Sequence, residues 1–180
     1  LHIEAFPKSQ PALEDAPRAA LKAAEYRIVL QQAVPKSAAA LARDLAQGGV
    51  EAQSTALTKL SKAGPSVLPI IADFLTLSDV LVRETAVDAA FGAGEEHAVA
   101  LILPHLETEK AESVLHAMIR NLGPHAKDEA QTKAIVRFLT HPAENVVITA
   151  LEALAASTAS DLAKDLAPLL SDPRWRVRAA

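Results

Sequence analysis

Apolar residues along the chain recur with a period of about thirty-one residues, and each group is followed by a polar stretch. A leucine precedes each polar stretch, and these leucines lie 30, 31, 33 and 31 residues apart: Leu45, Leu75, Leu106, Leu139 and Leu170. An alanine follows in the same frame four times: Ala56, Ala86, Ala117 and Ala150. The frame places a fifth alanine at position 181, so we expect the chain to continue beyond the last residues given.

Each repeat is predicted to form two helices. The first contains the alanine and spans about 50–63, 79–93, 110–122 and 143–157. The second ends near the leucine and spans about 66–76, 95–107, 127–140 and 159–170. Apolar residues also stand four positions before the leucine: Ile71, Ile102, Ile135 and Leu166. This i, i+4 stripe is typical of an amphipathic helix, and one helix pair cannot bury it without stacking on the next pair.

The chain divides into three parts. Residues 1–18 contain three prolines and little periodicity, which predicts an extended N-terminal arm. Residues 19–49 are predicted to form two helices, 20–34 and 35–49, that make an N-terminal cap or a degenerate repeat. Residues 50–180 hold the repeats, with boundaries at about 50–77, 78–108, 109–141 and 142–172, and the start of a further repeat at 173–180.

Composition supports an all-α fold class. The chain has 38 alanines and 24 leucines, aromatic residues make up only 3%, and β-branched runs with period two are absent. Alanine and leucine are the strongest helix formers, and a core built from them lets helices approach closely.

Charge and cysteine content exclude several classes of function. The net charge is −4 and the sequence pI is about 5.9, which argues against a nucleic-acid partner. The absence of cysteine removes disulfides, thiolate catalysis and Cys-ligated zinc. No apolar run is long enough for a membrane span. The cytoplasm is favoured as the location, and export stays open because the first residue is Leu rather than Met.

Two segments carry a common motif. SDVLVRETAVDAAFGAG (78–94) and SDPRWRVRAA (171–180) share an aspartate, a valine and an arginine: Asp79 and Asp172, Val82 and Val177, Arg83 and Arg178. With VLPIIADFL (67–75), they resemble the short HEAT repeats typified by phycobilin lyase subunits. The resemblance covers about residues 45–180 and implies a right-handed α-α superhelix, a HEAT-like solenoid of stacked antiparallel helix pairs.

The motif aspartate and arginine are expected to be structural. In such repeats they cap the first helix and link neighbouring units by charge-assisted hydrogen bonds. The two middle units depart from the pattern: Val114 and Val147 stand at the arginine position, and Lys110 and His141 lie near the aspartate position.

No constellation for catalysis, cofactor binding or metal binding is visible. None of the six histidines is followed by glutamate, which excludes the repeated His-Glu pairs of the HEAT-repeat deoxyhypusine hydroxylase. The sequence also lacks a nucleophile elbow and a Gly-rich phosphate loop. We therefore predict a protein that is not an enzyme and has no cofactor or metal.

In HEAT-type stacks the second helices line the concave face, and their phase predicts which residues point outward. One outward row is Asp73, Pro104, Arg137 and Pro168, and another is Pro69, Ala100, Lys133 and Lys164. A flanking row, one residue before each leucine, is Phe74, His105, Phe138 and Leu169. The predicted partner-binding residues are Asp73, Phe74, His105, Lys133, Arg137, Phe138 and Lys164. The alternative is that the aromatic rings pack between repeats and the charges are solvated.

The leading hypothesis for function is a scaffold that binds another protein or a peptide on this concave face. One alternative, implied by the resemblance alone, is a phycobilin-lyase-like subunit that acts on a tetrapyrrole. A third hypothesis is nucleic-acid binding, for which the basic cluster Arg174, Trp175 and Arg176 offers a stacking ring between two cations. The acidic balance of the chain disfavours that third reading.

Overall fold

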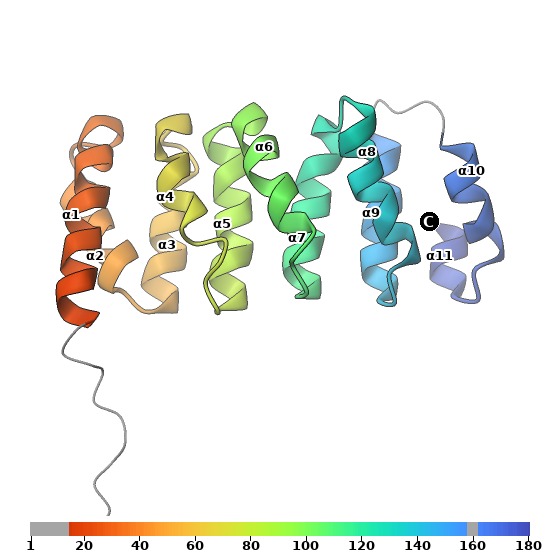
Figure 1. Ribbon diagram of the computed structural model, residues 1–180, viewed down its shortest axis with the longest axis horizontal. Helices are drawn as coiled ribbons and strands as arrows, with labels where there is room; N and C mark the ends of the chain where they lie inside the picture. Colours follow the sequence, from red (N-terminus) through yellow and green to blue (C-terminus); the bar gives the residue numbers. More distant parts are fainter. Residues whose placement is uncertain (1–14, 158–161) are drawn as a thin grey trace, which may run out of the picture.

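The structure, a computed structural model, describes residues 15–157 and 162–180. Most of the predicted arm therefore lies outside the described residues, as does the beginning of the helix predicted at 159–170. Every regular element in the described part is an α-helix or a 3-10 helix, arranged in two layers along an elongated row (Figure 1). The fold is an all-α solenoid.

The first helices of the repeats form one layer, here called the A layer. It consists of α3 (Val50–Leu60), α5 (Val80–Ala93), α7 (Glu112–Leu122), α9 (Glu144–Ala156) and α11 (Trp175–Ala179). Each of these helices packs against the next one in the list. The predicted first helices are thus confirmed, with boundaries that differ by up to a few residues.

The second helices form the other layer, here called the B layer. It consists of η1 (Pro65–Val67) with α4 (Leu68–Ala72), α6 (Glu95–Leu106), α8 (Glu129–Val136) with η3 (Arg137–Thr140), and α10 (Ala163–Leu166) with η4 (Ala167–Ser171). A further 3-10 turn, η2 (Gly123–His125), follows α7. Three of the four B-layer segments are partly 3-10 rather than continuous α-helix, which changes which residues share a face.

Two helices precede the repeats. In α1 (Asp15–Ala33) and α2 (Ala38–Gln47) the predicted pair is present, although α1 starts earlier than expected, so that residues 15–18 are helical and not part of an arm. Because α1 contacts η1 and α2 contacts α3, α1 adjoins the B layer and α2 adjoins the A layer (Figure 1).

The core repeats with the predicted frame. The leucines Leu45, Leu75, Leu106 and Leu139, the alanines Ala56, Ala86, Ala117 and Ala150, and the isoleucines Ile71, Ile102 and Ile135 are all buried. None of the helices in the described ranges is long and apolar enough to cross a membrane. The stacked units therefore share one continuous apolar interior.

Leu170 is the exception to the predicted frame. Its side chain is 76% exposed, whereas Leu166 and Leu169 pack against the core. This end of the B-layer segment is the 3-10 helix η4. With three residues per turn, Leu169 follows Leu166 on the same face, and Leu170 is rotated away from it.

A candidate interaction surface on the B layer

The outward rows predicted for the B-layer helices are confirmed as surface. All eight residues are exposed: Pro69, Asp73, Ala100, Pro104, Lys133, Arg137, Lys164 and Pro168. They come from successive B-layer segments, so the surface runs along the stack of helices (Figure 1). The term B-layer face is used below for this surface.

Two of the predicted partner-binding residues must be corrected. Phe74 is 2% exposed and Phe138 is 8% exposed, so neither ring is available to a partner. Each follows a buried isoleucine by three residues in a 3-10 or turn segment, where that spacing falls on the same face. The alternative, that these rings pack between repeats, is confirmed, and the ring of Phe74 lies 6.1 Å from that of Tyr26 in α1.

Asp73 ties α1 to the first repeat. Its Oδ2 accepts hydrogen bonds from Lys22 Nζ at 2.7 Å and from the Tyr26 hydroxyl at 2.9 Å. Burial, together with the neighbouring Asp73 carboxylate, raises the pKa of Tyr26 above its ordinary value, because both disfavour the phenolate. Asp73 is therefore exposed but already engaged within the chain.

The predicted cations of the B-layer face are largely compensated. Arg137 Nη1 donates to Glu107 of the preceding repeat at 2.7 Å, and Lys133 Nζ lies 2.6 Å from Glu129 one turn earlier. The Arg137 guanidinium also lies 6.0 Å from the centre of the Phe138 ring. Lys164 is exposed. This part of the face is charged but nearly neutral.

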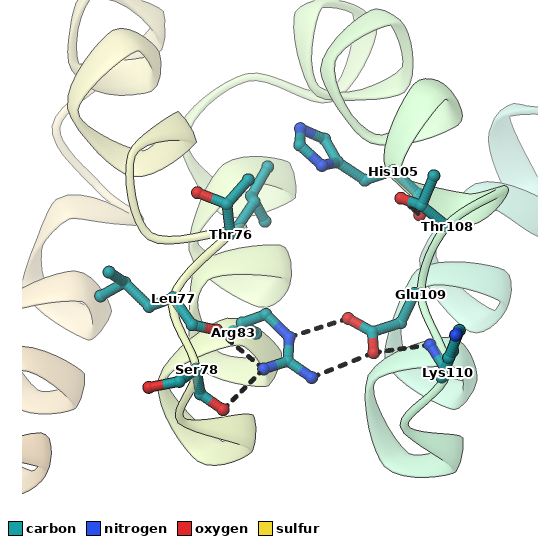
Figure 2. A pocket seen from close by; sticks show the side chains of 9 residues that line it. Thr76, Leu77, Ser78, Arg83, His105, Thr108, Glu109 and Lys110 are labelled. Atoms are coloured by element: carbon teal, nitrogen blue, oxygen red, sulfur yellow. Dashed lines mark hydrogen bonds and ion pairs between the residues drawn. The ribbon is translucent and has the colours of Figure 1, made fainter.

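His105 is half-buried and lines a groove of about 420 Å³ between the loops that end the first and second B-layer segments (Figure 2). The loop residues Thr76 and Leu77 form one side, and Thr108 and Glu109 form the other. His105 is thus a predicted site residue that lines this groove.

Arg83 also lines this groove and joins two successive repeats (Figure 2). Its Nε and Nη2 donate to the two carboxylate oxygens of Glu109 at 2.8 and 3.0 Å, and its Nη1 donates to the carbonyls of Leu77 and Ser78. Asp79 accepts a hydrogen bond from the Val82 amide at 3.0 Å and caps α5. The predicted structural roles of the motif aspartate and arginine are confirmed in this repeat.

Glu109 was missed by the sequence reasoning, although its place in the frame was a usable signal. It stands three residues after Leu106, near the position where other repeats carry aspartate or histidine. Its carboxylate accepts from the amides of Lys110 and Ala111, both at 2.8 Å, besides Arg83. His141 has the corresponding role in the next loop, where its Nδ1 accepts from the Ala143 amide.

In the last described repeat the motif is rearranged. Arg178 Nη1 donates to the carbonyls of Asp172 and Pro173, as Arg83 does to its own loop. Asp172 accepts from the backbone and side chain of Arg174, which lowers the pKa of the Asp172 carboxyl to about 2. The residue that precedes α11 directly is Arg174, so Asp172 orders the loop and does not cap the helix as expected.

The predicted basic patch, Arg174, Trp175 and Arg176, is only partly available to a partner. Arg174 is bound to Asp172 and to the carbonyls of His141 and Pro142 in the preceding loop. Arg176 donates to Asn145 and lies 4.0 Å from Glu144. Trp175 is 68% exposed. An exposed ring is present, but the two flanking cations contribute to contacts between repeats.

A second groove of about 380 Å³ lies between α1 and the loop after α4. Its walls include the apolar residues Ala19, Leu45, Ala46 and Phe74, and its rim carries Asp15, Arg18, Lys22 and Asp73. The part that α1 takes in this groove was not predicted from the sequence. No group of three or more His, Asp or Glu side chains in the described part of the chain is arranged to hold a metal ion.

Comparison with known proteins gives one match. Residues 99–180 match the protein family described as HEAT repeats. This segment is therefore similar to HEAT repeats. The matched range begins within α6, and α3 to α5, which lie outside it, continue the same two-layer packing. No curated protein and no solved structure matches the chain.

Proposed function

We propose that the chain is a non-enzymatic scaffold that binds another protein or a peptide on its B-layer face. The observation that carries the proposal is the regular exposure of one row of side chains from each successive B-layer segment. Such a surface is long, ordered and open, which suits an extended protein partner better than a small metabolite. HEAT repeats commonly serve as protein-interaction scaffolds, which supports the same role.

The contacts between repeats favour this role over nucleic-acid binding. Arg137 and Lys133 are paired with carboxylates, and Arg174 is engaged with Asp172 and two backbone carbonyls. Cations bound in this way have little remaining capacity to neutralise phosphates. For a phycobilin-lyase-like activity on a tetrapyrrole, no observation adds to the resemblance.

The test is cross-linking from two matched positions. A photoreactive residue is placed at Ala100 on the B-layer face or at Ala155, an exposed alanine of α9 in the A layer. We expect discrete cross-linked proteins from position 100 in an extract of the native organism and few from position 155. Ala100→Trp should also weaken recovery of those proteins while the circular dichroism spectrum is unchanged. Equal cross-linking from the two positions contradicts the proposal.

A further inference from the structure

The two grooves described above meet at one residue. Leu77 lines both the groove beneath His105 and the groove beside α1. Figure 2 shows the Leu77 side chain turned away from Arg83 and from the first groove, while its loop forms that groove's wall. The two grooves adjoin at the loop after α4, and the term channel is used below for the two of them together, from the first turns of α1 to the end of α6.

The middle of the channel is apolar. Leu77 is 37% exposed, and the groove beside it is lined by Ala19, Leu45, Ala46 and Phe74. An exposed leucine next to an apolar hollow offers a site for one apolar side chain of a bound segment.

The charges that line the channel are of two kinds. Two pairs are internally neutral: Lys22 lies 2.7 Å from Asp73, and Arg83 is bound to Glu109 through two hydrogen bonds. These pairs contribute no net charge for a partner to recognise.

The remaining charges leave an excess of cations. Arg18 at one end and Lys110 at the other make no ion pair within the described ranges, and His105 lines the same groove as Lys110. The acidic residue of the lining that is left without an ion pair there is Asp15, in the first turn of α1, where the helix dipole stabilises a carboxylate. Arg18 and Asp15 thus lie at one end of the apolar middle and Lys110 at the other, and the lining as a whole has one more cation than anion.

We propose that this channel binds an acidic segment of a partner protein, with an apolar side chain near Leu77 and carboxylates near Arg18 and Lys110. This inference rests on the proposed function and names the chemistry of the partner. The chain as a whole carries a net charge of −4, so attraction of an acidic segment depends on these local cations and weakens as salt rises.

The test uses three synthetic peptides of equal length in fluorescence anisotropy with the whole chain. One has Leu-Phe flanked by Glu and Asp, a second has Leu-Phe flanked by Lys and Arg, and a third has the acidic flanks around Gly-Gly. We expect saturable binding of the first alone, weakening with added salt. Equal binding of the acidic and basic peptides, or no binding of the acidic one, overturns the proposal.

Variants locate the binding to the channel. Arg18→Glu with Lys110→Glu should weaken the acidic peptide by at least about tenfold, because two favourable contacts become repulsive. The control, Lys59→Glu with Lys62→Glu, makes the same change of net charge at exposed positions in and directly after α3, and should weaken it less than about twofold. Similar losses in both double variants would mean that binding depends only on overall charge, and would overturn the assignment.

Failure here is separable from failure of the proposed function. If a protein cross-linked from position 100 still binds the Arg18→Glu, Lys110→Glu variant with unchanged affinity, the scaffold role stands and the acidic-segment inference is wrong. If position 100 gives no specific cross-link but the acidic peptide binds as expected, the channel binds an acidic segment and the proposed role of the wider B-layer face is wrong.

Discussion

The Arg83 guanidinium and the Glu109 carboxylate face each other through two parallel hydrogen bonds, of 2.8 and 3.0 Å, between successive repeats. Their side chains are 14% and 8% exposed, so the pair is shielded from water on most sides. Bidentate pairs of this geometry are the strong charge-assisted hydrogen bonds of proteins. The third and fourth repeats carry Val114 and Val147 at this position, so the pair is a local clamp between the second and third repeats.

Removing one partner of this clamp should be costly. Glu109→Ala leaves Arg83 charged and largely buried with only the two loop carbonyls, so we expect a loss of about 2–4 kcal/mol in the free energy of unfolding. Urea denaturation at neutral pH measures the change.

A double-mutant cycle provides the control for that measurement. Arg83→Met removes the charge and keeps most of the apolar stem, so Arg83→Met with Glu109→Ala should cost clearly less than the sum of the two single changes. Strictly additive losses would show that the two side chains do not stabilise each other.

The same carboxyl group predicts how stability depends on pH. Burial acts to raise the pKa of Glu109, but the hydrogen bonds from Arg83 and from the amides of Ala111 and Lys110 outweigh it, and the pKa is lowered from its ordinary 4.5. A group whose pKa is lowered by folding stabilises the fold above its unfolded pKa, and this contribution is lost as pH falls through the folded value. The pKa of Asp172 is likewise lowered by folding, from 3.8 to about 2, chiefly by the hydrogen bond from the Arg174 side chain.

The free energy of unfolding should therefore fall steadily as pH decreases below about 4.5. Urea denaturation from neutral pH down to about pH 2 follows the change. Glu109→Gln with Asp172→Asn should be less stable at neutral pH but lose less stability on acidification. If the double variant loses as much free energy of unfolding on acidification as the unmodified chain does, other carboxylates cause the loss.

The repeat frame could be derived from the sequence because stacking imposes the same burial on each unit. Leu75, Leu106 and Leu139 occupy equivalent buried positions, and spacing alone identified them. The outward rows could also be predicted from the sequence, because the phase of a helix fixes its outward positions once its inward positions are known.

Local backbone geometry could not be derived in the same way. The turn after α4 and the 3-10 helix η3 place the residue before the leucine in the core, which buries Phe74 and Phe138, and in η4 the 3-10 geometry exposes Leu170. Pairings between loops of different repeats, such as that of Glu109, depend on distances that neither propensity nor periodicity encodes. These features decide which predicted site residues are available to a partner.

Leu106 and Leu170 occupy the same position in the sequence frame but should respond differently to truncation. Leu106 is 2% exposed and Leu170 is 76% exposed. Leu106→Ala should lower the free energy of unfolding by about 2–4 kcal/mol, because it leaves a cavity in the core. Leu170→Ala should change it by less than about 0.5 kcal/mol. Thermal and urea denaturation distinguish the two, and equal losses would contradict the exposed placement of Leu170.

Tyr26 is the chain's one tyrosine, so its ionisation can be followed directly by ultraviolet absorbance. Burial, with the hydrogen bond to Asp73, raises the pKa of Tyr26 above the ordinary value of 10.0. We expect the phenolate to form only at pH values above that of a model tyrosine. Asp73→Asn removes the neighbouring charge and should move the titration back toward 10.0, whereas Asp88→Asn, a change in the A layer, should not. A titration already at the ordinary value would disprove the contact.

Gly123, which directly follows α7, lies against the backbone of α9 at Ala153. A Cβ atom at this position would lie 2.7 Å from the Cα and 2.8 Å from the carbonyl oxygen of Ala153, which belong to the backbone of α9 and cannot move aside as a side chain can. Gly123→Ala should therefore displace α7 from α9 and cost about 1–3 kcal/mol in the free energy of unfolding. Gly49→Ala is the control without a steric clash, because nothing lies within 4 Å of its Cβ position, and it should cost less than about 1 kcal/mol, through the poorer N-cap that alanine gives α3. Equal stability of the two variants in urea would mean that the A-layer helices do not pack as closely as the structure shows.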